Sequence, residues 1–217
     1  MGKLIVIDGL DGSGKNTQSK QLFNRLEKEG KKVRLVSFPD YESPACSPVK
    51  MYLGGSFGSD PDAVNSYAAS TFFAVDRFAS FRLDWKKDYD DGAIIIANRY
   101  TTANAIHQLT KLPEEEHEAF LRWLYDFEFV KLGLPVPDFT LLLQVPVEKS
   151  LELIDHRGEN KDIHENRDHL KKAAKASATC VKAWNWKTLS CVNEKGEMYS
   201  VEAIADMVYD MVKPMIK

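Results

Sequence analysis

The sequence lacks several features that would direct a protein to a membrane, to nucleic acid or to an oxidising compartment. No apolar run approaches the roughly 18 residues that suggest a membrane span, and Met1–Asp8 lacks the apolar stretch of a signal peptide. The three cysteines show no Cys-x-x-Cys spacing, which argues against structural zinc and a disulfide framework. A formal net charge of -3 gives no bulk attraction for nucleic acid or anionic lipid. We therefore expect a cytoplasmic protein with no nucleic-acid or membrane partner.

What the 217 residues do contain is a regular alternation of short apolar runs with stretches of helical spacing. Short apolar runs are typical of strands buried on both faces, and strands separated by helices indicate a mainly parallel sheet. The sequence thus predicts one α/β domain over residues 1–217, with a five-stranded, mainly parallel sheet flanked by helices. The expected strands are 4–7, 33–38, 93–97, 139–145 and 187–192. The expected helices are 15–29, 62–87, 113–131, 147–155, one that resumes after 168 and ends near 184, and 201–215.

The clearest motif is Gly9–Thr17, which fits Gly-x-x-x-x-Gly-Lys between a buried strand and the start of a helix. Glycines let backbone N–H groups converge on phosphate oxygens, and the helix N-terminus adds partial positive charge. Lys15 would then reach the β- and γ-phosphates of ATP. The predicted ATP contacts are Gly9, Gly12, Ser13, Gly14, Lys15, Asn16 and Thr17.

The residue after the motif lysine is usually Ser or Thr, whose hydroxyl binds Mg²⁺. Here it is Asn16, with Thr17 one place later. A side-chain amide oxygen is also an oxygen ligand, so we expect ATP with Mg²⁺ and take Asn16 as a candidate metal contact.

Further motifs follow in order along the chain: Phe38–Tyr41, Phe73–Arg77, Asn98–Tyr100 with Asn104, and Phe127–Phe129 with 133–138. Together with the phosphate loop, their order and spacing resemble the thymidylate kinases, a family of P-loop nucleoside monophosphate kinases. The resemblance covers nearly the full chain. It implies that the terminal phosphate of ATP is transferred to dTMP, and it implies a homodimer packed through long helices.

The resemblance assigns acceptor contacts to residues in these motifs. Phe73 would stack on thymine, and Arg77, one helical turn later, would hydrogen-bond the base. Arg99 follows a buried strand, at the edge of a parallel sheet where ligands bind, and would hold the acceptor phosphate as a catalytic residue. Asn104 matches a position that hydrogen-bonds thymine in some members, and Asp11 one that faces the acceptor sugar.

Other positions match the family less closely. Phe38 and Tyr41 lie in a loop where related sequences place a tyrosine near the acceptor phosphate. Other members carry an arginine in this loop, whereas this chain has Asp40. Asn98 replaces the usual Asp before the arginine, and His107 falls where members often carry Tyr. At three of these positions, Asp40, Asn98 and His107, the departure from the family could change the acceptor.

The polar stretch from about 156 to 168 resembles the family's lid over ATP. Arg157 would be the arginine that stabilises the transferring phosphoryl group, because Ser13 stands where some members place such an arginine in the phosphate loop. Lys161 and Arg167 are secondary candidates. Glu165 would approach Mg²⁺ or the acceptor sugar.

Two alternatives stay open from the sequence. The first is a kinase for another nucleoside monophosphate or a nucleoside, although a nucleoside kinase would want a carboxylate to accept the hydroxyl proton, and no Glu-Arg or Asp-Arg pair ends the relevant strand. The second is a catalytically weak nucleotide-binding module, which Asn16 and Asn98 favour. A GTPase-like switch would need Asn-Lys-x-Asp, and Asn160-Lys161-Asp162 is not that pattern.

Overall fold

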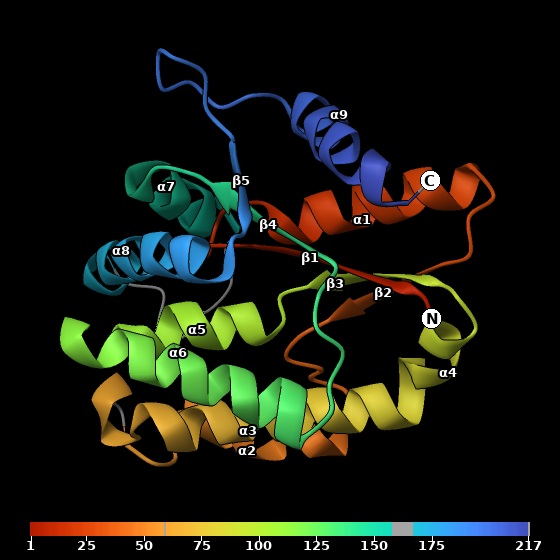
Figure 1. Ribbon diagram of the computed structural model, residues 1–217. Coiled ribbons are helices and arrows are strands. Elements are labelled where there is room, and N and C mark those ends of the chain that lie inside the picture. The colour runs from red at the N-terminus through yellow and green to blue at the C-terminus, as the bar shows by residue number, and fades with distance from the viewer. Residues whose placement is uncertain (59, 158–166, 217) are drawn as a thin grey trace.

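The computed structural model describes residues 1–58, 60–157 and 167–216. Its centre is a five-stranded sheet in which each strand runs parallel to its neighbours, in the order β2-β3-β1-β4-β5 (Figure 1). The predicted five-stranded parallel sheet is therefore confirmed. The strands are β1 (Lys3–Gly9), β2 (Val33–Ser37), β3 (Ile94–Asn98), β4 (Phe139–Gln144) and β5 (Lys187–Ser190).

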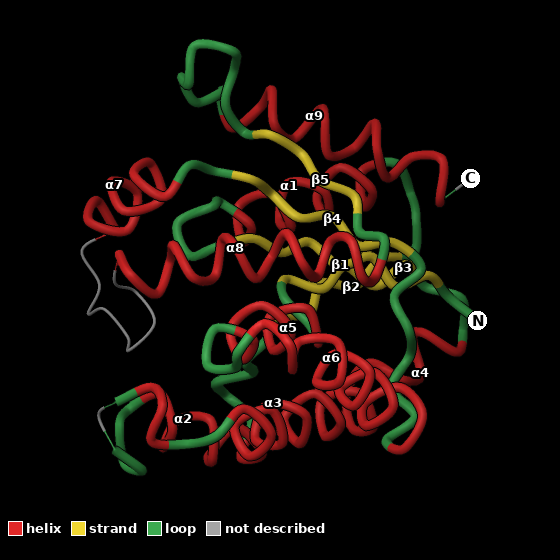
Figure 2. Tube along the Cα trace, turned by 60° about the vertical axis from the view of Figure 1, so that its left-hand side comes forward, coloured by secondary structure: helices red, strands yellow, loops and turns green. Residues whose placement is uncertain are grey.

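Helices cover both faces of the sheet, which explains why the strands read as continuous apolar runs. On one face, α1 (Lys15–Lys28) and α9 (Val201–Val212) pack against Ile5, Ile7 and Ile96. On the other, α5 (Thr101–Leu109), α6 (His117–Tyr125) and α8 (Arg167–Trp184) pack around Leu142. Figure 2 shows α5 between the sheet and the helices α3 (Ser66–Ser80) and α6.

The remaining elements lie at several places around this framework (Figure 1). They include the helices α2 (Ser47–Leu53), α4 (Lys86–Asp90) and α7 (Val147–Arg157). π-Helical turns at Phe81–Trp85 and Asp126–Lys131 continue α3 and α6, and 3₁₀ turns span Pro44–Cys46, Pro61–Ala63, Glu114–Glu116 and Lys213–Met215. No helix of the described residues is long and apolar enough to cross a membrane.

Two helices, α2 and α5, were not among the predicted elements. In α5 eight of nine residues are buried, from Thr101 to Leu109, because its polar side chains Asn104, His107 and Gln108 line the cavity and do not face bulk solvent. Its first position also lacks a side-chain cap, since Tyr100 at the N-cap makes no capping hydrogen bond. With nine residues and no side-chain cap, α5 lacks the length and the start signal that identify a helix in a sequence.

The predicted helix 62–87 begins later than expected. The Asp60 side chain accepts a hydrogen bond from the Asp62 backbone N–H and caps a single 3₁₀ turn, and Val64 is extended. The true cap is Asn65, whose side-chain oxygen accepts a hydrogen bond of 2.9 Å from the Ala68 backbone N–H.

Replacing Asn65 by Ala should therefore lower the free energy of unfolding by about 1 kcal/mol, the usual cost of losing an N-cap. Asp60→Ala is the matched control and should cost clearly less, because it caps one turn that does not continue into α3. Urea denaturation of both variants measures the difference. Equal losses in the two variants would mean that the cap of α3 does not lie at Asn65.

Candidate active site

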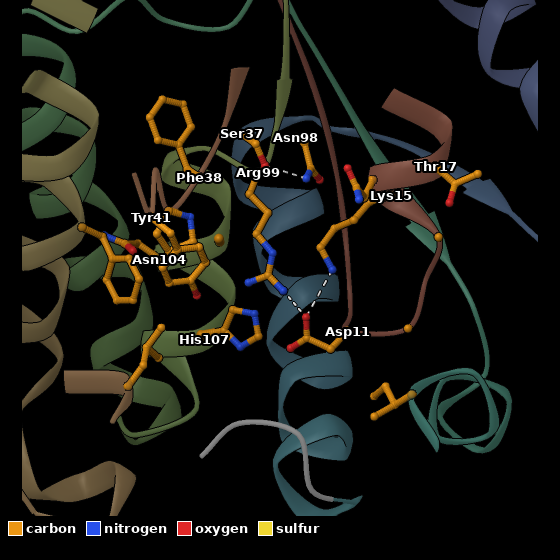
Figure 3. Close-up of a pocket in the computed structure, with 18 of the residues that line it drawn as sticks. Asp11, Lys15, Thr17, Ser37, Phe38, Tyr41, Asn98, Arg99, Asn104 and His107 are labelled. Atoms are coloured by element: carbon orange, nitrogen blue, oxygen red, sulfur yellow. Dashed lines mark hydrogen bonds and ion pairs between the residues drawn. The ribbon is translucent and has the colours of Figure 1, made fainter. Parts of the chain in front are cut away.

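A cavity of about 650 Å³ opens where β1, β2 and β3 end. Its walls come from the loop between β1 and α1, from the segment after β2, from the end of β3 and from one side of α5. This is the carboxyl edge of a parallel sheet, where open α/β folds bind their ligands. Ten of its residues are labelled in Figure 3.

The loop between β1 and α1 is held in a shape that only glycine permits. Gly12 and Gly14 have φ of 78° and 79°, in the left-handed region. A Cβ on Gly12 would lie 2.4 Å from the Ser150 carbonyl oxygen, and one on Gly9 would lie 2.8 Å from the Leu143 carbonyl oxygen. The backbone therefore turns tightly beneath the N-terminus of α1, as a phosphate cradle requires.

Three charged side chains meet at the centre of the cavity (Figure 3). Lys15 Nζ lies 3.2 Å from Asp11 Oδ1 and also donates to the Leu10 carbonyl oxygen at 3.1 Å. Arg99 forms an ion pair with the same Asp11 oxygen. Two cations thus share one carboxylate, which leaves a net positive charge facing the cavity.

Burial and charge act against each other on these groups. Burial alone would raise the pKa of Asp11, but Arg99 and Lys15 beside it hold that pKa well below its usual range. The pKa of Lys15 is lowered, first by burial and then by Arg99, with Asp11 and Asp8 opposing the shift. Arg99 also has a φ of 65°, a conformation that non-glycine residues rarely adopt and that is enriched at functional sites.

The far end of the cavity is lined by aromatic and amide side chains. Phe73, on α3, meets Tyr52 edge-on with ring centroids 6.1 Å apart. Asn104, on α5, donates from Nδ2 to the Ser70 carbonyl oxygen at 3.1 Å. Phe38 packs on Tyr100, while Tyr41 is about half exposed at the rim. The residues predicted to hold the acceptor base and its loop thus line one wall.

His107 also lines the cavity, on the next turn of α5, and lies near Asp11 in Figure 3. Its Nδ1 is 3.0 Å from Nε2 of His169 on α8, with the two rings parallel. Burial lowers the pKa of His169, and the charges nearest that ring are Asp11, Lys111, Lys172 and Asp62. The histidine pair therefore joins the cavity wall to α8.

Arg77 is placed differently from the expected base contact. Its side chain is 1% exposed and does not line the cavity. Its Nε and Nη2 donate to the two carboxylate oxygens of Glu128 at 2.7 and 2.6 Å. The guanidinium lies behind the wall formed by Phe73 and Asn104, and its predicted contact with the base stays a prediction.

Oxygen atoms suited to a hard cation occur near the phosphate loop. Asn98 donates from Nδ2 to Ser37 Oγ at 2.8 Å, and its own Oδ1 is buried without a hydrogen-bond partner among the described residues. Asn16 and Thr17 are exposed on the cavity wall. The described residues contain no cluster of three or more His, Cys, Asp or Glu, but Mg²⁺ at nucleotide sites takes most of its ligands from phosphate and water, so these donors fit it.

Three of the predicted residues lie wholly or partly outside the described part of the structure. Arg157 is the last residue of α7, and its side chain lies outside the described part of the structure. Glu165 and Lys161 also lie outside the described residues. Arg167 begins α8 and approaches Glu148 at 3.8 Å.

Sequence reasoning missed two buried acids near the site. Glu128, which is fully buried, pairs with Arg77 and accepts a hydrogen bond of 2.7 Å from the Thr101 hydroxyl. Asp76 accepts one of 2.9 Å from the Asp40 backbone N–H and so fixes the loop after β2. The available signal was an acid inside each of two aromatic segments, 73–77 and 127–129, where a charge needs a buried partner.

The fold and the site together define a P-loop nucleotide phosphotransferase. A glycine loop opens a helix at the end of β1, its lysine points into a cavity, and a second cation lies at the end of β3.

Comparison with known proteins narrows the class. The family model described as thymidylate kinase matches residues 7–200, and the chain belongs to the thymidylate kinase family. The thymidylate kinase of Mycobacterium tuberculosis is 34% identical over 148 residues, 67% of each chain. That of Caenorhabditis elegans is 28% identical over 219 residues, covering 96% of this chain and 90% of the relative. The structure of thymidylate kinase from Candida albicans shares the fold, with a TM-score of 0.75 at 21% identity over 98% of this chain and 92% of that one.

Replacing Asp11 by Asn should destabilise the ligand-free protein, because it leaves Lys15 and Arg99 close together without their carboxylate. At neutral pH the loss should be on the order of 3 kcal/mol. Since the folded-state pKa of Asp11 is depressed, its contribution is present above the ordinary aspartate pKa of about 3.9 and is lost as pH falls further. The gap between wild type and variant should stay constant from pH 7 to about pH 5 and narrow below about pH 4.

Denaturation at several pH values measures this gap. Asp210→Asn, which changes an exposed carboxylate on α9, is the matched control and should shift stability little. A gap as small as that of the control at neutral pH would show that the cluster does not contribute to folding.

Proposed function

We propose that this protein transfers the terminal phosphate of ATP to dTMP, giving dTDP and ADP. The observation that carries the proposal is a single cavity with Lys15 at one end, Phe73 and Asn104 at the other, and Arg99 between them. A donor phosphate in the glycine loop and an acceptor base on Phe73 would therefore bring their phosphates together at Arg99. The thymidylate kinase relatives support dTMP as the acceptor.

Phosphoryl transfer requires mainly that the two substrates are positioned and that the charge of their phosphates is neutralised. Asp11 holds Lys15 and Arg99 before substrate binds, and phosphate oxygens would take over the contacts that this carboxylate now makes. Lys15 then binds the donor phosphates, and Arg99 holds the acceptor phosphate, with fork geometry suited to an oxyanion. No strong general base is required, since the acceptor atom is already a phosphate oxygen. Asp11 is left to face the acceptor sugar.

Mg²⁺ would supply further neutralisation of the phosphates, and we propose Asn16 as a contact, with Asn98 Oδ1 as a second oxygen near the site. The segment 156–168 is expected to act as the lid of a single kinase domain, with Arg157 on the transferring phosphoryl group and Glu165 near Mg²⁺ or the sugar.

The expected partner is a second copy of this chain. Tyr67, Val75 and Phe78 leave 38–45% of their surface exposed along one side of α3, and Leu83 beyond them leaves 87%. Such a patch supports a homodimer packed through this helix, which sedimentation equilibrium tests directly. A cytoplasmic location fits the three free, buried cysteines at positions 46, 180 and 191.

Two other functions remain distinguishable. A kinase for another acceptor would use Lys15 and Arg99 in the same way. Asp40, Asn98 and His107 favour this alternative, because they depart from the residues expected for the family. A catalytically weak binding module would bind ATP without turnover.

With Mg²⁺ and ATP, we expect ADP release to be fastest with dTMP among dTMP, dUMP, UMP, dCMP, dGMP, AMP and thymidine. Lys15→Met should lower kcat by about 10²–10³-fold, because one preorganised cation is lost from the transition state. Lys28→Met, an exposed lysine on the same helix, is the matched control and should leave kcat unchanged. Preferred turnover of another acceptor would exclude dTMP, and ATP binding with no turnover would favour the binding module.

Arg157→Ala should lower kcat by about 10³-fold while changing the Kd for ATP little, as expected for an arginine used in the transition state. Lys149→Ala, which removes a basic side chain of the same helix that pairs with Glu152, should have no such effect. If kcat for the Arg157 variant stays within a factor of two of wild type, the phosphoryl group is stabilised by another residue, with Lys161 and Arg167 the next to test.

A further inference from the structure

Glu128 is the centre of a buried hydrogen-bond network behind the acceptor end of the cavity. Its Oε2 accepts from Arg77 Nε at 2.7 Å and from the Thr101 hydroxyl at 2.7 Å. Its Oε1 accepts from Arg77 Nη2 at 2.6 Å and from Asn104 Nδ2 at 3.5 Å. A carboxylate has about four lone-pair sites, so the network uses all of them. The side chain is fully buried, which makes each of these contacts costly to lose.

The network fixes which way the Asn104 amide points. Its Nδ2 donates to the Ser70 carbonyl oxygen at 3.1 Å and makes a longer, weaker contact of 3.5 Å with Glu128 Oε1, so both of its hydrogens have an acceptor. Turning the amide over would place Oδ1 against two acceptors, a carbonyl and a carboxylate. Oδ1 itself accepts no hydrogen bond from the described residues, and Asn104 lines the cavity. The wall therefore offers a hydrogen-bond acceptor to whatever lies there.

A hydrogen-bond acceptor on the cavity wall must be matched by a hydrogen-bond donor on the ligand. Thymine and uracil carry N3–H, a donor, whereas N3 of cytosine is an acceptor. A site built around one hydrogen bond rejects an analogue that lacks the matching group, because the site's own polar atom is then left unpaired. The orientation of a single amide thus distinguishes two pyrimidines of nearly equal shape.

We propose that Glu128 is a positioning residue that turns Asn104 Oδ1 toward the cavity and so selects pyrimidine nucleotides with an N3–H donor over those without one. The inference rests on the proposed acceptor site. Glu128 acts on the base through Asn104, and it also holds Arg77 by two of its nitrogens. One buried carboxylate thereby determines which hydrogen-bonding atoms the cavity wall presents to the base.

Equilibrium binding of dTMP and dCMP, measured by calorimetry without ATP, tests the proposal independently of turnover. Wild type should bind dTMP more tightly. In Glu128→Gln the ratio of the two Kd values should shrink by about tenfold or more, since the glutamine N–H groups draw Oδ1 away from the cavity. Asn104→Ala should shrink the ratio similarly, and the double variant should shrink it no further than Asn104→Ala alone. The Kd for ATP should not change.

Thr101→Val is the matched control: it removes one donor from the same carboxylate without touching Asn104, and its ratio should stay within about twofold of wild type. If Glu128→Gln does not fold, Glu128→Asp keeps the charge for Arg77 but withdraws it from Asn104, and the same fall in the ratio is expected.

Several results would overturn the inference alone: an unchanged ratio in the folded Glu128 variant, equal weakening of dTMP and dCMP binding, or a fall as large in Thr101→Val. A wild-type protein that binds dTMP no better than dCMP would overturn the proposed acceptor as well.

Discussion

The burial of β1 between β3 and β4 is the constraint on which the site depends. Leu4–Ile7 are fully buried, so β1 occupies the middle of the sheet and its carboxyl end opens at the middle of the sheet edge. The loop that follows must then turn tightly under α1, where Gly9 and Gly12 avoid the backbone of Leu143 and Ser150. Arg99 comes to the same place because β3 pairs with β1 in parallel register, Ile7 opposite Asn98. The two cations of the site meet because two parallel strands end side by side.

Two acids hold the cations of the site. One pairs with the cations at the sheet edge, and the other pairs with Arg77 on α3. Asp11 lies in the cavity, where its carboxylate pairs with Lys15 and Arg99 in the place that we propose for phosphate oxygens. Glu128 lies behind the wall and is fully buried, so its ion pair with Arg77 is shielded from the cavity. A buried ion pair contributes little net stability compared with apolar packing, but removing one partner is costly. In the functions proposed above, the first acid holds the two cations ready for phosphate, and the second fixes the geometry of the wall that meets the base.

The sequence predicted most of the framework, because the framework depends on local patterns. Continuous apolar runs identify buried strands such as Ile94–Asn98, and a glycine motif between strand and helix identifies the phosphate loop. The helix α5 escaped prediction because it has only nine residues and begins without a side-chain cap. The position of Arg77 escaped it because i and i+4 spacing places two residues on one helix face without saying which one reaches a cavity. That choice was made by Glu128, which is 51 residues away in the chain.

Asn98 stands where the family resemblance predicts an aspartate. Its surroundings show what a neutral side chain does at this position. An aspartate there would add negative charge beside Arg99, next to the site where acceptor phosphate is expected. The amide keeps the bond to Ser37 and leaves its oxygen buried and unpaired, as a neutral ligand atom. With Asp11 as the acid paired to Lys15 and Arg99, the cavity stays cationic. A neutral side chain at this position leaves the positive charge of Arg99 available to a phosphate. A neutral oxygen also attracts a cation less than a carboxylate does, so a divalent cation bound with a nucleotide would take more of its ligands from the phosphates.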